Sequence, residues 1–517
     1  MRFITQLGSL LALSTSLFIP VGAQAQTQGA DTLEGRIANG LATQQFPSVG
    51  YLILVGPKGT GFCSGTLIGC RTFLTAAHCV CTEDNGNTLL GADCLKRPDL
   101  LDPTGKLVFL QNAGNFSVAS ISVDPVFEFG VRGDFAVLTL ATPVTGVAPS
   151  PLSTTARPPA GTAGTIVGFG LSSGNSSFDV GIKRTGKVVT TTCPASLVPA
   201  NTHVCWVFKD PVGAPGLDSD TCEGDSGGPL FVNLGQGSVL AGVTSGGDTN
   251  CVPTDNSFDT DVFVHRAYLM SAAGADLGSA SCGGLPAAGS PGTTVVQASG
   301  TLNVSTPRKR VTLDVPPGTD RLRVTLNNSA DSDFDLYVKQ GTTPATPARF
   351  DCRSEDPDLP DTCEILSPAA GPWNLLALRA GGNGDFQMTA TLYTARTVPP
   401  GPCVPSATAM CLTGGRFKVE VTWRTPDGLT GAAHTLPLTD NSGYVWFFNP
   451  DNVEAIVKVL NACSISGRYW FFAGGLTNVE TVITVTDTQA GIVRTYSNPQ
   501  GTAFAPIQDT AAFATCP

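Results

Sequence analysis

Short runs in which apolar and polar residues alternate dominate the chain. Residues 310–315 (RVTLDV) and 417–423 (FKVEVTW) are typical, because nearly every second side chain is apolar. A period of two places successive side chains on opposite faces of a β-strand. Helical periodicity is scarce, and its best case is residues 265–275. The pattern therefore predicts an all-β protein with little helix.

Breaks in this pattern divide the chain. At 517 residues it is too long for a single hydrophobic core. A Gly-, Ala- and Pro-rich stretch covers residues 283–296, and a Pro-rich stretch covers residues 394–402. Neither has apolar periodicity, so both are expected to be linkers. We therefore predict folded domains at residues 37–282, 297–393 and 403–517.

The N-terminus carries the pattern of a secretory signal. Arg2 precedes an apolar stretch at residues 10–19, and Ala23 and Ala25 offer the small residues that a signal peptidase recognises. A membrane anchor is the alternative, but polar residues and Pro20 interrupt a stretch shorter than the roughly 20 residues that span a bilayer. We expect residues 1–25 to be a signal peptide and the mature protein to be secreted, without a membrane span.

Cysteine content and net charge further restrict the class of protein and its possible partners. The 16 cysteines fit an oxidising compartment, and each predicted domain holds an even number of them. No Cys-x-x-Cys pair occurs, so disulfides are favoured over structural zinc. The net charge of −11 argues against a nucleic-acid partner, which requires clustered Lys and Arg. No cofactor is expected, and the protein is predicted to be a monomer.

Ser226 is the candidate nucleophile. It lies in Gly224-Asp225-Ser226-Gly227-Gly228, followed by a proline. The flanking glycines allow a tight turn that can present the serine hydroxyl together with the backbone amides of Gly224 and Ser226 as an oxyanion hole. An ordinary glycine-serine loop is the alternative.

A base and an acid complete the candidate site. Of the four histidines, His78 is favoured because it follows a strand within Thr75-Ala76-Ala77-His78-Cys79, where Cys63 could bridge to Cys79. Asp134 is the candidate acid, because it opens the apolar run 135–138 and so can be buried against an imidazole. Asp124 and Glu128 are competitors in what is expected to be a loop.

Residues 37 to about 276 resemble a trypsin-like serine protease of the chymotrypsin family, through these three local motifs and their order. The resemblance implies a double β-barrel and an acyl-enzyme mechanism. In that mechanism His78 is the general base and then the general acid, Asp134 orients it, and Ser226 is acylated. The expected reaction is endopeptidase cleavage of polypeptide substrates.

The resemblance also implies a zymogen. The sequence Arg36-Ile37-Ala38-Asn39-Gly40 is similar to the family's activation junction. Cleavage after Arg36 would free the amino group of Ile37 to pair with Asp225, which makes residues 26–36 a propeptide.

Specificity follows from the same resemblance. Asp220, six residues before the nucleophile, corresponds to the base of the primary pocket and favours Arg or Lys before the cleaved bond. Ser245 and Gly247 are expected to line the pocket. Gly246 stands where the family usually has Trp, so the adjoining subsites are expected to be more open. The segment 256–263 aligns loosely, with Asp259 or Asp261 near the pocket.

Several disulfides are implied as well. Three pairs resemble family bridges, whereas the other two are guesses from position. The pairs are Cys63–Cys79, Cys193–Cys205 and Cys222–Cys251, then Cys81–Cys94 and Cys70–Cys282.

The trailing domains are expected to be small β-sandwich-like modules. Residues 297–393 resemble the bacterial pre-peptidase C-terminal domain, through Asp335-Leu336-Tyr337-Val338 and the Gly-x-Trp start at Gly371. Clustered acids at Asp331, Asp333 and Asp335 allow calcium, but a solvated strand edge is favoured because few ligands are visible. The aromatics of residues 403–517 are expected at alternate core positions.

A second hypothesis comes from another class of protein. The protease fold could be an inactive scaffold for an extracellular binding or adhesion protein whose C-terminal modules do the work. An intact set of triad residues and an intact activation junction favour the active enzyme.

Overall fold

The structure is a computed structural model. It describes residues 37–517 except 57–58, 84, 174–178, 236, 249, 279–292, 317–318, 358, 367, 395, 427–428, 499 and 517. The predicted signal peptide, the predicted propeptide with Arg36, most of the predicted linker 283–296, and Cys282 with its predicted bridge to Cys70 lie outside the described residues.

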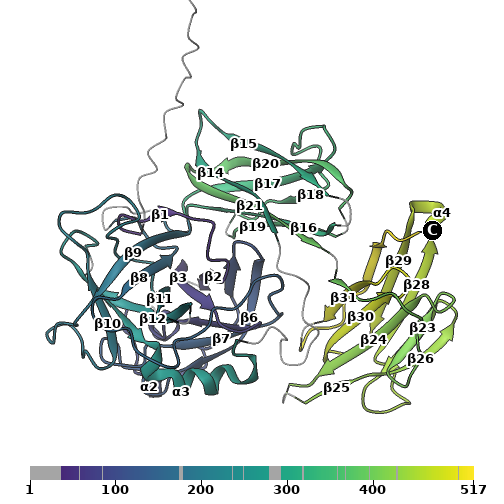
Figure 1. Cartoon of the computed structure of the whole chain (residues 1–517), viewed down its shortest axis with the longest axis horizontal. Coiled ribbons are helices and arrows are strands. Elements are labelled where there is room, and N and C mark those ends of the chain that lie inside the picture. Colours follow the sequence, from purple (N-terminus) through teal and green to yellow (C-terminus); the bar gives the residue numbers. More distant parts are fainter. Residues whose placement is uncertain are drawn as a thin grey trace, which may run out of the picture. The chain divides into compact units, whose positions relative to one another are not determined.

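The first β-barrel is closed, with strand order β2-β3-β4-β7-β6-β5 (Figure 1). Its interior is apolar, with Leu52, Phe73, Val108 and Leu138 fully buried. The strands are β2 (Val49–Gly56), β3 (Gly59–Leu67), β4 (Thr72–Thr75), β5 (Lys106–Leu110), β6 (Gly114–Val123) and β7 (Ala136–Leu140).

The second β-barrel has the strand order β1-β9-β10-β13-β12-β11-β8 and is closed by the pairing of β8 with β9. With the first barrel it confirms the expected chymotrypsin-like double β-barrel. The strands are β1 (Leu41–Ala42), β8 (Ala163–Gly168), β9 (Arg184–Thr191), β10 (His203–Val207), β11 (Pro229–Asn233), β12 (Ser238–Gly247) and β13 (Asn256–Asp261).

Helices are few and short in the described part of the barrels. The longest is α3 (Val262–Ala273), which begins three residues before the predicted start because the Asp261 side chain accepts a hydrogen bond from the Val264 amide at 3.1 Å. The others are α1 (His78–Cys81), α2 (Gly91–Cys94) and a 3-10 turn at Gly274–Asp276. No helix in the described ranges is long and apolar enough to cross a lipid bilayer.

The middle module is a two-layer β-sandwich with sheets β14-β21-β16-β19 and β15-β20-β17-β18. Side chains from both sheets, including Val324, Leu336, Trp373 and Met388, form one core. Its first strand starts at Thr293, inside the predicted linker. The strands are β14 (Thr293–Leu302), β15 (Arg308–Val315), β16 (Thr319–Asn328), β17 (Asp333–Gln340), β18 (Cys352–Ser354), β19 (Asp361–Leu366), β20 (Gly371–Gly381) and β21 (Gly384–Thr394).

The last module also has two sheets, β22-β31-β30-β24-β23 with β25 on β24, and β26-β27-β28-β29-β32. Strand β22 lies inside the predicted linker 394–402. The elements are β22 (Arg396–Thr397), β23 (Ala409–Leu412), β24 (Phe417–Arg424), β25 (Thr430–Ala432), β26 (His434–Thr439), β27 (Ser442–Trp446), β28 (Ala455–Ala462), α4 (Cys463–Ser466), β29 (Arg468–Gly475), β30 (Glu480–Asp487), β31 (Ile492–Asn498) and β32 (Ile507–Phe513).

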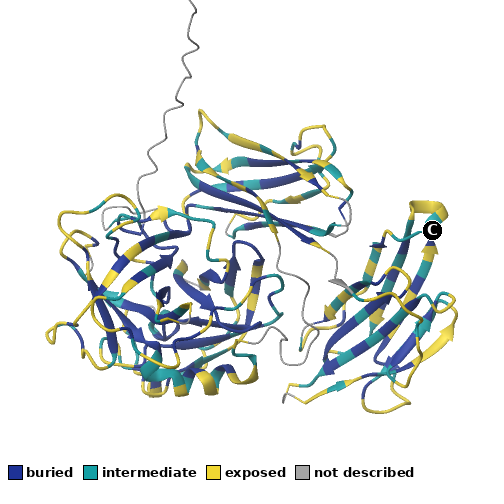
Figure 2. Cartoon of the chain, in the orientation of Figure 1, coloured by how far each residue is buried: buried dark blue, intermediate teal, exposed yellow. Residues whose placement is uncertain are grey.

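Burial alternates along the strands of this last module (Figure 2). Trp423, Tyr469 and Phe471 face the core, as expected for alternate core positions. Trp470 and Phe472 point the other way along β29 and are only partly buried, so the core explanation is wrong for them.

Candidate active site

His78 is the first residue of α1, directly after strand β4 and two fully buried alanines, Ala76 and Ala77. The Cys63–Cys79 disulfide joins β3 to this helical turn, and the Thr82 hydroxyl donates to the His78 carbonyl at 2.7 Å. The backbone of His78 is therefore held from both sides. Its side chain remains partly exposed (16%).

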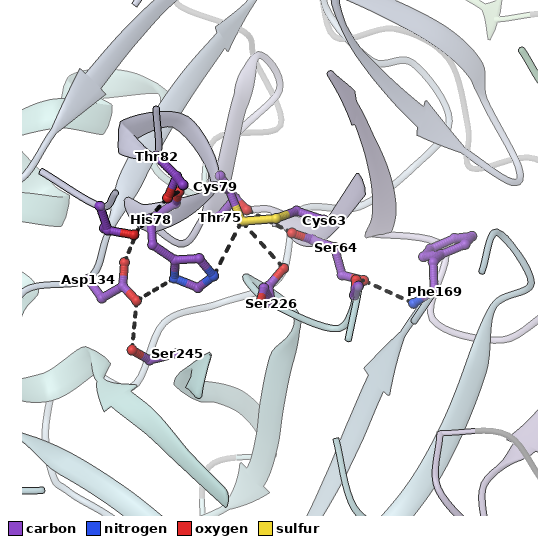
Figure 3. Close-up of a disulfide and its surroundings, with 12 residues drawn as sticks. Cys63, Ser64, Thr75, His78, Cys79, Thr82, Asp134, Phe169, Ser226 and Ser245 are labelled. Atoms are coloured by element: carbon purple, nitrogen blue, oxygen red, sulfur yellow. Dashed lines mark hydrogen bonds and ion pairs between the residues drawn. A yellow bond between two sulfur atoms is a disulfide. The ribbon is translucent and has the colours of Figure 1, made fainter. Parts of the chain in front are cut away.

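Asp134 lies just before β7 and is almost completely buried. Its Oδ1 accepts a hydrogen bond from the His78 backbone amide at 2.9 Å, and its Oδ2 lies 2.7 Å from His78 Nδ1 (Figure 3). A carboxylate can only accept, so Nδ1 carries the proton in this pair. The other ring nitrogen, Nε2, is then left with its lone pair.

Ser245, at the end of β12, donates its hydroxyl hydrogen to Asp134 Oδ2 at 2.6 Å. Sequence analysis placed Ser245 in the wall of the substrate pocket and missed this contact. Because the hydroxyl is engaged by the acid, only the backbone of Ser245 is available to substrate. Oδ2 of Asp134 therefore contacts both the His78 ring and the Ser245 hydroxyl.

The two competing acids are engaged elsewhere. Asp124 Oδ2 lies 3.2 Å from Nδ1 of a different histidine, His265 on α3. Glu128 pairs with Arg132 on the surface at 3.6 Å. Of the three acids considered, only Asp134 contacts His78.

Ser226 lies beside the imidazole of His78 in Figure 3. The Sγ atom of Cys79 is 4.0 Å from His78 Nε2 and 3.9 Å from the Ser226 carbonyl oxygen, so the disulfide lies next to both. The Ser226 carbonyl also accepts a hydrogen bond from the Ser64 amide at 2.8 Å.

The turn that carries Ser226 depends on glycine. Gly224 and Gly227 adopt φ values of +88° and +82°, which other residues rarely adopt. A Cβ atom on Gly227 would also lie 2.1 Å from Thr75 Oγ1. The Ser64 hydroxyl holds the turn by donating to the Gly224 carbonyl at 2.9 Å.

Asp225, between these residues, points into the protein and is buried. Its two carboxylate oxygens accept hydrogen bonds from the amides of Gly170 (2.8 Å) and Cys222 (2.9 Å). Burial nevertheless raises the pKa of Asp225 to about 7. Ile37 is also fully buried, and the next residue, Ala38, accepts a hydrogen bond from the Asp220 amide at 3.0 Å.

Asp220 has no exposed surface. Its Oδ1 accepts hydrogen bonds from Trp206 Nε1 at 2.9 Å and from the Ser257 hydroxyl at 2.6 Å. Burial outweighs these donors and raises the pKa of Asp220 to about 7. The site therefore holds a desolvated carboxyl group that would be stabilised by a cation.

Gly246 lies against an aromatic ring of the neighbouring strand. A Cβ atom on Gly246 would lie 2.8 Å from the ring of Phe258, which belongs to the neighbouring strand β13. The Phe258 ring in turn packs edge-on against His203. A buried aromatic side chain from the adjacent strand therefore lies beside Gly246, and the expectation of more open subsites stays a prediction.

Sequence analysis also missed Phe129. Its ring contacts the His78 ring edge-on, with centroids 5.3 Å apart, and it is about half exposed. Phe129 is one of four apolar residues in the loop 124–133, and nothing in the sequence distinguished it from the others. The pair gives the exposed side of His78 an aromatic neighbour.

The four disulfides within the described residues of the barrels are implied pairs, whereas for the two modules only an even number of cysteines was predicted and no pairing. The disulfides are Cys63–Cys79, Cys81–Cys94, Cys193–Cys205 and Cys222–Cys251 in the barrels, and Cys352–Cys363, Cys403–Cys411 and Cys463–Cys516 in the two modules.

Among the described residues, no group of three His, Cys, Asp or Glu side chains gathers at the predicted calcium acids. Across the described ranges, the side chains close enough to hold an ion are Cys63, His78 and Cys79, and these two sulfur atoms are bonded to each other. Asp335 accepts a hydrogen bond from the Tyr337 hydroxyl at 3.0 Å. Calcium binding at Asp331, Asp333 and Asp335 stays a prediction.

A double β-barrel with this arrangement of histidine, aspartate and serine is typical of a serine hydrolase. Comparison with known proteins identifies the family. Residues 40–268 match the family described as Trypsin. The chain is 34% identical over 205 residues to a trypsin of Saccharopolyspora erythraea, covering 38% of this chain and 79% of that protein. It is 27% identical over 268 residues to trypsin alpha-4 of Lucilia cuprina, covering 51% of this chain and 96% of that protein.

A third relative is phenoloxidase-activating factor 3 of Holotrichia diomphalia, 32% identical over 206 residues, covering 37% of this chain and 58% of that protein. The chain belongs to the trypsin family of serine endopeptidases. The match ends before the two C-terminal modules.

Proposed function

We propose that this protein is a secreted serine endopeptidase that cleaves after Arg or Lys, with His78, Asp134 and Ser226 as its catalytic triad. The observation that carries the proposal is the double contact of Asp134 with His78, at 2.9 Å to its backbone and 2.7 Å to its ring. This contact orients the imidazole and leaves Nε2 directed away from the acid.

Peptide cleavage then proceeds in two halves. His78 Nε2 takes the proton from Ser226 Oγ while Oγ bonds to the carbonyl carbon, and the amides of Gly224 and Ser226 donate to the oxyanion. The imidazolium gives its proton to the leaving amine, which departs and leaves an acyl-enzyme. Water, deprotonated by His78, attacks the ester, and the proton returns to Ser226 as the acid product leaves.

Asp220 is the proposed selector of a basic residue before the cleaved bond. Its Oδ1 is occupied by Trp206 and Ser257, and its Oδ2 has no hydrogen-bond partner among the described residues. A desolvated acid with a free oxygen favours a cationic side chain by charge-assisted hydrogen bonding. The same burial penalises a neutral side chain that leaves the acid unpaired.

The raised pKa of Asp220, about 7, makes cation binding pH-dependent. The free protein holds the proton below this pH, whereas a bound amidinium requires the carboxylate. We expect the Asp220 proton by itself to contribute about a tenfold rise in benzamidine affinity per pH unit below pH 7. Calorimetric titration of the form beginning at Ile37 measures this. In Asp220→Asn, affinity that stays high and pH-dependent contradicts the role of Asp220.

Activation by cleavage between Arg36 and Ile37 is part of the proposal. The burial of Ile37 and the proximity of Ala38 to Asp220 support it, as does a buried Asp225 whose pKa is raised to about 7. An amino group at Ile37 would supply the cation that stabilises the charged form of Asp225. Asp225 lies between the two oxyanion-hole residues, so the pairing would order the turn.

Arg36→Gln is expected to block this activation. Without the new terminus the oxyanion hole is not ordered, and amidase activity should fall by about 10² to 10³, the range for losing oxyanion stabilisation. The assay compares Arg p-nitroanilide hydrolysis and N-terminal sequencing in wild type and variant. Full activity in a chain that still begins before residue 37 would contradict activation at this junction.

Secretion is proposed from the disulfides and the N-terminal signal pattern.

We also propose that the middle β-sandwich is a pre-peptidase C-terminal domain of bacterial type, supported by its two four-stranded sheets and the Gly371-Pro372-Trp373 start of β20. Acidic net charge supports the absence of a nucleic-acid partner, and a monomer is proposed.

A fluorophosphonate probe separates the enzyme from the inactive-scaffold alternative. The form beginning at Ile37 should be labelled at Ser226 and should hydrolyse an Arg p-nitroanilide. A folded Ile37 form that is neither labelled nor active would favour the binding or adhesion protein.

A further inference from the structure

A second buried acid, Asp259, shares a strand face with the residues around Asp220. Asp259 and Ser257 are two positions apart on β13, so their side chains lie on the same face. The Ser257 hydroxyl on that face contacts Asp220 at 2.6 Å. The charge of Asp220 also acts on Asp259, which places the two acids close together.

Asp261, the other acid considered near this pocket, is already engaged. Its Oδ1 caps α3 through the Val264 amide at 3.1 Å, and its Oδ2 pairs with Arg157 at 2.6 Å. Asp259 is therefore the acid of this segment that remains available to the pocket.

Asp259 has no exposed surface, and neither of its carboxylate oxygens has a hydrogen-bond partner among the described residues. Thr244 lies opposite it on β12, but the Thr244 hydroxyl makes no hydrogen bond of ordinary geometry either. Gly242 provides the space, because a Cβ atom there would lie 2.6 Å from Asp259 Oδ2. The barrel thus has room for this carboxyl group but gives neither of its oxygens a hydrogen-bond donor among the described residues.

Such an unsatisfied group is unusual in a protein interior outside functional sites. Burial raises the pKa of Asp259 well above its usual range, the charge of Asp220 raises it further, and Thr244 partly offsets the rise. Asp220 Oδ2 is unpartnered as well. The two acids together leave three buried oxygens without a donor.

Two described arginines of the protease domain, Arg157 and Arg184, are committed to other partners. Arg157 pairs with Asp261, and Arg184 donates to the carbonyls of Gly170, Asp179 and Ile182. The missing donor is therefore expected to come from a bound molecule.

We propose that Asp259 is a second specificity-determining acid of the primary pocket, which acts with Asp220 to select a guanidinium over an ammonium group. The inference rests on the proposed function, because it assigns the substrate side chain that the protease accepts. A guanidinium presents five N–H donors in a planar fork and can be shared by two carboxylates, whereas an ammonium is a compact charge with three donors. Arg is thus preferred over Lys before the cleaved bond.

Substitution of Asp259 by Asn tests this selection directly. In the form beginning at Ile37, kcat/KM is measured on p-nitroanilides that differ only in Arg or Lys. We expect the Arg-to-Lys ratio to fall by about tenfold to a hundredfold, mostly through a higher KM for Arg, because one charge-assisted contact is lost. Asp248→Asn, an exposed acid of the adjoining loop, is the matched control and should leave the ratio unchanged.

Labelling with the fluorophosphonate probe distinguishes failure of the Asp259 proposal from failure of the proposed function. The probe reacts at Ser226 and does not have to bind in the primary pocket. If Asp259→Asn is labelled normally and keeps both its Arg-to-Lys ratio and its benzamidine affinity, the role of Asp259 is overturned while the protease stands. Failure of wild type to be labelled contradicts the proposed function instead.

Wild type provides a test that needs no folded variant at Asp259. If both acids hold protons when free and lose them to a bound amidinium, the Asp259 proton adds a second tenfold rise to that of Asp220. Over the pH range in which both acids are protonated, benzamidine affinity then rises by about a hundredfold per pH unit rather than tenfold. Among the groups around the two acids, Trp206, Ser257 and Thr244 are neutral, and the charge of Asp255 acts on Asp220. Asp255→Asn should keep the steep slope, and a wild-type slope of tenfold or less overturns the proposal.

Discussion

Ser226→Ala is expected to lose almost all peptidase activity while keeping its fold. The substitution removes the oxygen that attacks the substrate but leaves the backbone of the turn, including the amides of Gly224 and residue 226. We expect kcat to fall by about 10⁶, the scale observed when a serine nucleophile is removed. Hydrolysis of an Arg p-nitroanilide by the form beginning at Ile37 measures the loss.

Ser64→Ala is a useful comparison for this variant. Ser64 holds the same turn through its hydroxyl, which donates to the Gly224 carbonyl at 2.9 Å, but it is not proposed to react. It should lose far less activity than Ser226→Ala and should still react with the fluorophosphonate probe. Wild-type rates in Ser226→Ala, with an unchanged thermal unfolding transition, would rule out Ser226 as the nucleophile.

Asp134→Asn is expected to lower kcat by about 10⁴ with little change in the fold. The amide can donate a hydrogen bond to His78 Nδ1, which favours the tautomer whose proton is on Nε2. That ring can no longer take the proton of Ser226. The loss is measured by comparing kcat of wild type and Asp134→Asn for hydrolysis of an Arg p-nitroanilide over a series of increasing pH values.

Asp124→Asn is the matched control, because Asp124 forms the other histidine–aspartate pair, with His265 at 3.2 Å. The same chemical change at Asp124 should leave kcat within about threefold. Asp124 does not contact the reacting atoms, and a substitution at an independent site is not expected to change their arrangement. Equal losses in the two variants would indicate that Asp134 matters for folding rather than for the tautomer of His78.

Much of this arrangement could be predicted from the sequence because it is encoded in short segments. The glycines around Ser226 and the small residues before His78 specify their local turns within a few positions. Strand alternation likewise predicted an all-β chain with trailing β-modules, whereas the double barrel was implied by the resemblance to the protease family. The choice of Asp134 over Asp124 was favoured by its position at the start of a buried strand.

The contacts that could not be predicted from the sequence are those that depend on strand register. Ser245, Gly246 and Thr244 lie at a bulge of β12, where the pairing with β13 shifts between Thr244 and Gly246. A shift of one residue exchanges the two faces of a strand. Whether Ser245 meets Asp134, and whether Phe258 covers Gly246, is therefore decided by pairing across strands and not by the local sequence.

The Cys63–Cys79 bridge links catalysis to the redox state of the compartment. It fixes the turn that begins at His78, and one of its sulfur atoms lies 4.0 Å from the nitrogen proposed to accept the Ser226 proton. Chains that fold among reducing thiols would lack this restraint and hold His78 loosely. Exposure to an oxidising environment is thus expected to be a second requirement for activity, beside the proposed cleavage after Arg36.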